Sequence, residues 1–223
     1  MQKFLYFISS PIGGKIVMAL SGAMMIIFLL GHALGNLLIF SSQNALNSYA
    51  HWLQHSPFLW VFRISMLLLL SLHIFLAVQL YLQNRIARPV SYYINKDIQL
   101  SFSAKTMVLS GFFTLLFVFF HIAHLTLGWV PTTSFELLDN NQMIDVYNNV
   151  VRGFKQPLIS LFYLFSIFII SLHLRHAIKS IFQTLGFHHE NFHRFLDYLS
   201  PALILALMLA FMSIPLSVMS GFL

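Results

Sequence analysis

Four histidines lie deep inside long apolar segments of the chain, one in each of four segments: His32, His73, His121 and His173. An imidazole is costly in the apolar interior of a membrane unless it has a partner, so residues of this kind mark functional sites. Imidazole is also a common metal ligand. Four imidazoles on four helices can supply both axial ligands to each of two haems, and a haem with both axial positions filled transfers electrons instead of binding oxygen.

The depths of these histidines predict which of them pair. At the rise of an α-helix, His32 and His121 lie roughly 25 Å from one end of the bundle. His73 and His173 lie on helices that run the other way, roughly 18 Å from the same end. We therefore expect two sites at two depths, an outer one formed by His32 and His121 and an inner one formed by His73 and His173.

For two of the four predicted ligands, a second histidine nearby in the sequence is an alternative. His124 follows His121 by three residues and His176 follows His173 by three, so each pair can share a helix face. We favour His121 and His173 because they lie deeper in their apolar segments. The other histidines fall in predicted loops and are interpreted as solvated polar residues: His51, His55, His188, His189 and His193.

The elements that must hold the histidines follow from composition. Hydrophobic residues make up 58% of the 223 residues and charged residues only 8%, whereas soluble domains carry roughly a quarter charged residues. Five apolar segments are long enough to cross a bilayer as helices: 16–40, 58–84, 102–129, 157–184 and 197–222. The prediction is one all-α domain over 1–223, a membrane bundle of five helices. We assign no internal repeat, and we expect two short amphipathic helices, at 46–54 and 143–151.

Basic residues orient this bundle. One end carries nine lysines and arginines: Lys3, Lys15, Arg85, Arg88, Lys96, Lys105, Arg175, Lys179 and Arg194. The other end carries three: Arg63, Arg152 and Lys155. The positive-inside rule then places the amino terminus in the cytoplasm. Candidate partners for haem propionates on this side are Lys15, Ser21, Lys105, Arg175 and Lys179.

Composition also excludes several kinds of site. The chain has no cysteine, so it cannot form a disulfide, a thiolate-ligated haem or an iron–sulfur cluster of its own. The net charge of +6 does not indicate nucleic-acid binding, because the basic residues lie between apolar segments and form no stripe.

Short motifs surround the buried histidines and precede the first segment. In chain order they are Ser10-Pro11-Ile12-Gly13-Gly14-Lys15, Gly31-His32-Ala33-Leu34-Gly35-Asn36, Leu72-His73-Ile74, Phe120-His121-Ile122-Ala123-His124 and Leu172-His173-Leu174-Arg175-His176. As an ordered set they resemble the cytochrome b membrane anchors of succinate:quinone oxidoreductases and fumarate reductases, in the single-subunit, five-helix, dihaem form. The resemblance covers essentially the whole chain.

The resemblance implies two haems b, an outer one ligated by His32 and His121 and an inner one ligated by His73 and His173. It implies partners as well: a flavoprotein with covalent FAD and an iron–sulfur protein, docked on the cytoplasmic face of a bacterial inner membrane. Dicarboxylate chemistry would occur in those subunits. Electrons would pass through the haems to a quinone, with menaquinone expected, so the implied function is that of a succinate dehydrogenase anchor.

Departures from the family pattern bear on the alternatives. Some fumarate-reducing relatives carry a glutamate two residues before the fourth-helix ligand, where this chain has Ser171, and another near the outer end of the second helix, whereas residues 41–60 contain no acid. Both differences favour a succinate dehydrogenase over a fumarate reductase. The remaining alternatives are a dihaem anchor of a hydrogenase or formate dehydrogenase, a transporter that uses histidines for protons or metal ions, and a haem-free structural anchor.

Overall fold

The structure is a computed structural model, and it describes residues 2–87, 106–130, 138–139, 141–187 and 189–223. Helices account for most of these residues. The described part of the chain contains no strand, only an isolated bridge between Leu138 and Ile144. The predicted all-α class is confirmed.

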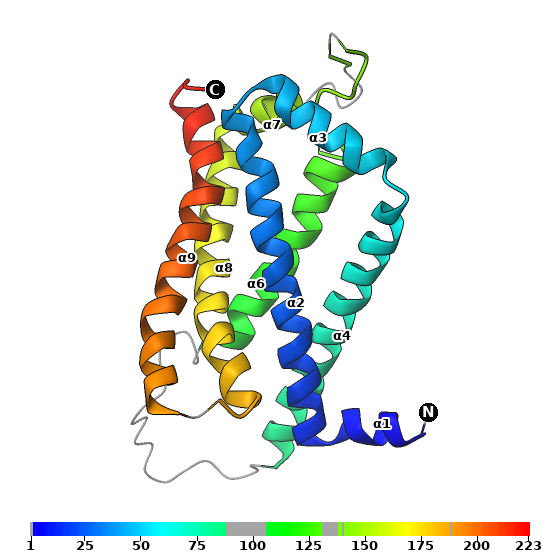
Figure 1. Cartoon of the computed structure of the whole chain (residues 1–223), viewed down its shortest axis with the longest axis vertical. Helices are drawn as coiled ribbons and strands as arrows, with labels where there is room; N and C mark the ends of the chain where they lie inside the picture. Colours follow the sequence, from blue (N-terminus) through cyan, green and yellow to red (C-terminus); the bar gives the residue numbers. More distant parts are fainter. Residues whose placement is uncertain (1, 88–105, 131–137, 140, 188) are drawn as a thin grey trace.

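Five long helices form the body of the molecule (Figure 1). They are α2 (Pro11–Leu37), α4 (Phe58–Ile86), α6 (Met107–His121), α8 (Pro157–Thr184) and α9 (Glu190–Met219). Short continuations lengthen α2 and α6, namely η1 (Leu38–Phe40) and η2 (Ile122–Thr126). All five are then long and apolar enough to cross a membrane, which confirms the predicted multi-pass architecture at that level.

The first long helix begins earlier than predicted, at Pro11 instead of residue 16. The Ser10 hydroxyl caps it by accepting a hydrogen bond from the amide of Gly13 at 3.1 Å, and proline is favoured in the first turn. The preceding helix α1 (Gln2–Ser9) was not predicted. A β-carbon at Gly13 would collide with the carbonyl of Phe7 in α1, so the sharp turn between these helices requires glycine.

Two further boundaries differ from the predicted ones. The fifth long helix begins at Glu190, seven residues before the predicted start at 197. In the third long helix, the regular α-helical part ends at His121 and a π-helical turn continues to Thr126, three residues before the predicted end at 129. Residues 102–105 of that segment lie outside the described residues. A π-helical turn next to a histidine is notable because such turns occur frequently at functional sites.

Short helices cross the two ends of the bundle. Figure 1 shows α1 lying across one end, and α3 (Gln43–His55) and α7 (Val146–Phe154) across the opposite end. The last two confirm the elements expected at 46–54 and 143–151, with shifted boundaries. They are joined by a polar clasp, which we define as Gln43, Asn47, Asp139, Asp145 and Asn148.

The long helices pack in two pairs joined through α2 and α8. Helix α2 packs against α4, α6 packs against α8, and α8 also contacts α2 and α9. Among the described elements, α4 packs mainly against α2 and touches α3 only slightly, and little of its most apolar stretch is buried inside the molecule. Exposed side chains on α4 include Leu67 and Phe75. A surface this apolar suits lipid contact.

Candidate cofactor site

The outer histidine pair lies between α2 and α6. The ring centres of His32 and His121 are 5.8 Å apart, with planes at 89°. A metal–imidazole bond is about 2 Å long, so imidazoles bound to opposite sides of one ion have ring centres roughly 6 Å apart. Phe28 stacks on His32 at 5.3 Å, and Phe117 packs on His121 at 5.7 Å. The structure therefore brings together the two side chains predicted to share the outer site.

Each inner histidine is held by a serine of the neighbouring helix. Ser21 Oγ lies 3.1 Å from Nδ1 of His73, and Ser110 Oγ lies 3.2 Å from Nδ1 of His173. Both serines donate their own proton to a backbone carbonyl three residues earlier, at 2.9 and 3.1 Å. Each hydroxyl must therefore accept from the imidazole. This pattern assigns the proton of both histidines to Nδ1 and leaves both Nε2 lone pairs free for a metal ion.

A glycine follows each of these serines and lets an imidazole lie against the helix backbone. A β-carbon added at Gly22 would lie 3.4 Å from Cε1 of His73. One added at Gly111 would lie 3.2 Å from Cε1 of His173, which is tighter than ordinary side-chain packing. The absence of a side chain at both positions is thus part of how the inner histidines are placed.

These matching contacts reveal an internal repeat that the sequence analysis missed. Residues of α2 recur in α6 at an offset of 89, and residues of α4 recur in α8 at an offset of 100. In α2 the recurring residues are Met18, Leu20, Ser21, Gly22, Phe28 and His32, which match Met107, Leu109, Ser110, Gly111, Phe117 and His121 in α6. In α4 they are Phe62, Ser71, Leu72 and His73, which match Phe162, Ser171, Leu172 and His173 in α8. We call α2 with α4 the first hairpin, and α6 with α8 the second.

Aromatic contacts follow the same repeat. The rings of Phe28 and Phe62 are 5.7 Å apart in the first hairpin. Their counterparts in the second hairpin, Phe117 and Phe162, are 6.1 Å apart. The two hairpins are therefore two copies of one arrangement. The four predicted ligands occupy equivalent places in it.

The π-helical turn separates the two neighbouring histidines of the third span. His121 faces His32, whereas His124 is 1% exposed and packs against the backbone of Gly153 in α7. Both imidazoles contact the hydroxyl of Tyr163, at 3.3 Å from Nδ1 of His121 and 2.9 Å from Nδ1 of His124. Tyr163 was not predicted as a site residue, because nothing in its sequence neighbourhood distinguishes it from other aromatic residues.

The donor sets are pairs of imidazoles. The described residues include no group of three or more His, Cys, Asp or Glu side chains that could hold a metal ion. A pair suits an ion whose equatorial ligands come from a porphyrin. The close ring pair and the free Nε2 atoms fit such a group. At His32 the ion would replace a hydrogen bond, since the Asn36 amide lies 3.2 Å from its Nε2.

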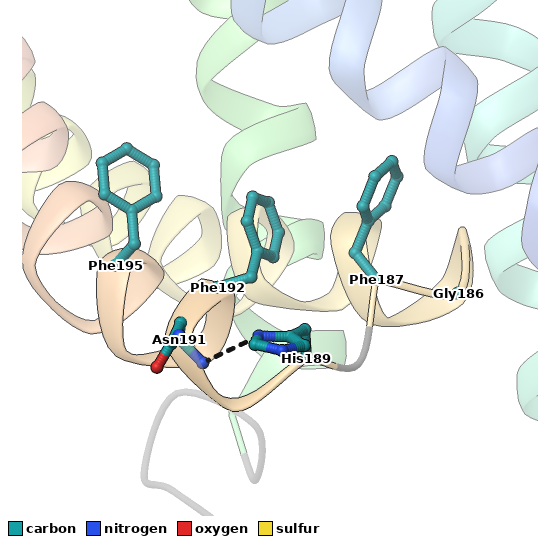
Figure 2. Close-up of a pocket in the computed structure, with 6 residues that line it drawn as sticks. All are labelled: Gly186, Phe187, His189, Asn191, Phe192 and Phe195. Atoms are coloured by element: carbon teal, nitrogen blue, oxygen red, sulfur yellow. Dashed lines mark hydrogen bonds between the residues drawn. The ribbon is translucent and has the colours of Figure 1, made fainter.

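Other predicted residues have different roles. Ser21, a candidate propionate partner, contacts His73 instead, and Lys179 pairs with Asp197. Lys105 and His188 lie outside the described residues. Of the loop histidines, His189 is not simply solvated: it caps α9 by accepting a hydrogen bond from the amide of Asn191 at 3.3 Å (Figure 2).

The remaining loop pair lies on α3, at the end of the bundle that carries the polar clasp. The rings of His51 and His55 are 4.0 Å apart, as their spacing of four residues allows. Nδ1 of His55 lies 2.9 Å from the carbonyl of His51. Both side chains are exposed, which agrees with their interpretation as polar surface residues.

Comparisons with protein-family models, with curated proteins and with solved structures found no match to this chain. Its function is therefore inferred from residue chemistry and geometry.

Proposed function

We propose that this chain is the dihaem cytochrome b that anchors a succinate dehydrogenase in the membrane and carries electrons between its iron–sulfur subunit and a quinone. The observation that carries the proposal is the repeated hairpin. It places imidazoles in equivalent positions on four helices, each within a candidate membrane span. Two of these imidazoles have Nε2 free for a metal ion.

The repeat also supports the pairing of the ligands. If the two hairpins face each other in equivalent orientations, each histidine lies opposite its own counterpart. His32 then pairs with His121, in agreement with their ring separation of 5.8 Å. The same correspondence would pair His73 with His173, which are held by the equivalent serines Ser21 and Ser110.

The chain's own residues would prepare each site for electron transfer. A bis-histidine haem supplies one-electron chemistry and leaves no position for oxygen. Ser21 and Ser110 hold the inner imidazoles by their Nδ1 protons, which fixes the ring orientation and raises ligand basicity. Phe28 and Phe117 cover the outer pair, and an apolar shell of this kind limits water access and tunes reduction potential.

The proposal includes a topology and partners. The end carrying α1 is placed in the cytoplasm of a bacterium, as the excess of basic residues there favours. A flavoprotein with covalent FAD and an iron–sulfur protein would dock at that end. His73 and His173 would hold the inner haem and His32 and His121 the outer one, and the two haems would supply one-electron transfer between the iron–sulfur protein and a quinone, with menaquinone expected.

Succinate oxidation is favoured over fumarate reduction because residue 171 is a serine instead of a glutamate. This side chain is 7% exposed, and its hydroxyl donates to the carbonyl of Phe168 at 2.6 Å. It therefore offers no protonatable carboxyl where some fumarate-reducing relatives carry one. A fumarate reductase anchor is the second candidate, and an anchor of another respiratory complex, such as a hydrogenase, is the third.

A reduced-minus-oxidised spectrum of the protein purified from membranes tests the haem proposal. We expect the bands of low-spin haem b and two haems per chain by pyridine haemochrome assay. The soluble subunits that co-purify with the tagged chain test the assignment to a complex, and we expect a flavoprotein and an iron–sulfur protein with succinate:quinone activity. A haem-free protein would overturn the proposal, and hydrogenase subunits would replace it by the third candidate.

A further inference from the structure

The two hairpins cease to match around His121. Tyr163, which contacts His121, corresponds to Arg63 in the first hairpin, and His124 corresponds to Gly35. The second hairpin therefore has a phenol and a second imidazole beside its outer ligand, where the first hairpin has an arginine and a glycine. The hydroxyl of Tyr163 lies 3.3 Å from Nδ1 of His121, the outer ligand of the second hairpin. His124 contacts the same hydroxyl through its own Nδ1.

The hydrogen bonds of these three residues must run in one direction if His121 binds a metal ion. Coordination through Nε2 leaves the imidazole proton on Nδ1, so His121 donates to the oxygen of Tyr163. A tyrosine hydroxyl has a single proton, and the shorter contact, 2.9 Å, runs to Nδ1 of His124. Tyr163 therefore donates to His124, whose own proton lies on Nε2.

The far end of this chain of hydrogen bonds is closed to water. Nε2 of His124 is buried and has no hydrogen-bond partner in the described structure. A β-carbon at Gly153 would lie 2.9 Å from this nitrogen, so the backbone of α7 packs directly against the ring. Tyr163 is 4% exposed and packs edge-on against Phe117 and Phe154. Buried polar groups without a hydrogen-bond partner are rare in proteins, and redox sites are one of the places where they occur.

We propose that Tyr163 and His124 are positioning residues for His121, which fix its proton on Nδ1, direct its Nε2 toward the outer haem iron and lower the reduction potential of that haem. This inference rests on the proposed function. A hydrogen bond accepted from Nδ1–H makes the imidazole a more basic ligand. A more basic ligand stabilises oxidised iron, and so the potential falls. The inner haem, held through serines, lies outside this chain of hydrogen bonds.

The test uses the complete membrane complex and measures the midpoint potential of each haem by optical redox titration, together with haem content and the EPR spectrum of the oxidised haems. Tyr163→Phe removes the hydroxyl and keeps the ring packing. We expect two haems, a more positive potential for one of them and a changed EPR signal for the same one. His124→Leu should shift that haem in the same direction by less, since Tyr163 still accepts from His121.

Tyr198→Phe is the matched control, because this tyrosine is 75% exposed and belongs to α9, outside both hairpins. It should leave both potentials unchanged. Wild-type potentials in both Tyr163→Phe and His124→Leu would overturn the inference, as would equal shifts of the two haems. If the Tyr163→Phe protein loses its outer haem, the inference is judged on His124→Leu alone: a more positive potential of one haem supports it, and wild-type potentials overturn it. Absence of haem from the wild-type complex would contradict the proposed function instead.

Discussion

The hydroxyl of Ser21 accepts a hydrogen bond from His73 across the interface of α2 and α4. The hydroxyl of Ser110 accepts the equivalent bond from His173 across the interface of α6 and α8. Each bond fixes the proton of an intramembrane imidazole on Nδ1. Side-chain hydrogen bonds inside a membrane contribute modestly to stability, about 0.6 kcal/mol on average. Their main effect here is to orient the ring, so substitutions should alter the cofactor more than the fold.

Replacement of either serine by alanine should weaken the inner haem site. Ser21→Ala or Ser110→Ala removes the acceptor of the Nδ1 proton, and loss of such a partner lowers metal affinity roughly 10- to 100-fold. We expect reduced occupancy of one haem after mild haem extraction, measured by pyridine haemochrome. Ser213→Ala is the control, because within the described part of the chain the Ser213 hydroxyl donates to the carbonyl of Ala210 in its own helix. Equal haem retention in all three variants would contradict the role of the serines.

A methyl group at Gly111 should displace His173. The β-carbon of Gly111→Ala would lie 3.2 Å from Cε1 of the imidazole, so the ring or the helix must shift. We expect loss or a changed potential of the inner haem with the outer haem retained. Gly31→Ala is a matched control beside an outer ligand, since no atom of the described residues lies within 4 Å of its added carbon. An effect as large at Gly31 as at Gly111 would rule out this steric account.

Removal of single ligands should separate the two haems. His73→Ala and His173→Ala should each remove the low-spin signal of the inner haem, and His32→Ala and His121→Ala that of the outer one, because a low-spin haem b of this kind needs both axial histidines. Optical redox titration should then show one component in place of two. His51→Ala, on the exposed face of α3, should retain both. Two bis-histidine haems in His73→Ala and in His173→Ala would show that the pairing is wrong.

The polar clasp should make the stability of the α3–α7 end depend on pH. Burial alone raises the pKa of the Asp145 carboxyl, but hydrogen bonds from Asn148, Asn47 and Gln43 outweigh it and hold the pKa below its ordinary value of 3.8. A carboxyl with a lowered folded pKa stabilises the protein above its unfolded pKa, and this contribution is lost as pH falls through the folded pKa.

Asp145→Asn tests this dependence by thermal unfolding of the detergent-solubilised protein between about pH 3 and pH 7. At neutral pH the variant should be less stable by about 1–3 kcal/mol, because donors of Gln43 and Asn148 lose a charged acceptor. Its stability should also decline less than that of the wild type below about pH 4. Glu190→Gln, at an exposed carboxyl of α9, should follow the wild-type profile. Parallel pH profiles for Asp145→Asn and wild type would contradict the account.

Much of the fold could be predicted because apolar length is a strong signal. The five long helices follow from it, and so does the depth of the four histidines. Boundaries such as Pro11 and Glu190 were misplaced because they depend on caps at Ser10 and His189, which lie among polar residues with no apolar pattern.

The supports of the histidines could not be predicted in the same way. Ser110 and Tyr163 act across helix interfaces, and contacts between residues 42 to 63 positions apart leave no local pattern. The repeat was missed because its matching residues are sparse and because its two offsets, 89 and 100, differ. Only the shared contacts of Ser21 and Ser110 make the correspondence evident.

The repeated hairpin also has an evolutionary consequence. Two copies of one helix pair, joined in a single polypeptide with α9 outside the repeat, are what duplication and fusion of a gene for a shorter ancestor would leave. Such an ancestor would have built both sites as a homodimer, with identical imidazoles on either side of each. After such a fusion the copies would be free to diverge, and the positions of Tyr163 and His124, where the first hairpin has Arg63 and Gly35, are places where they differ.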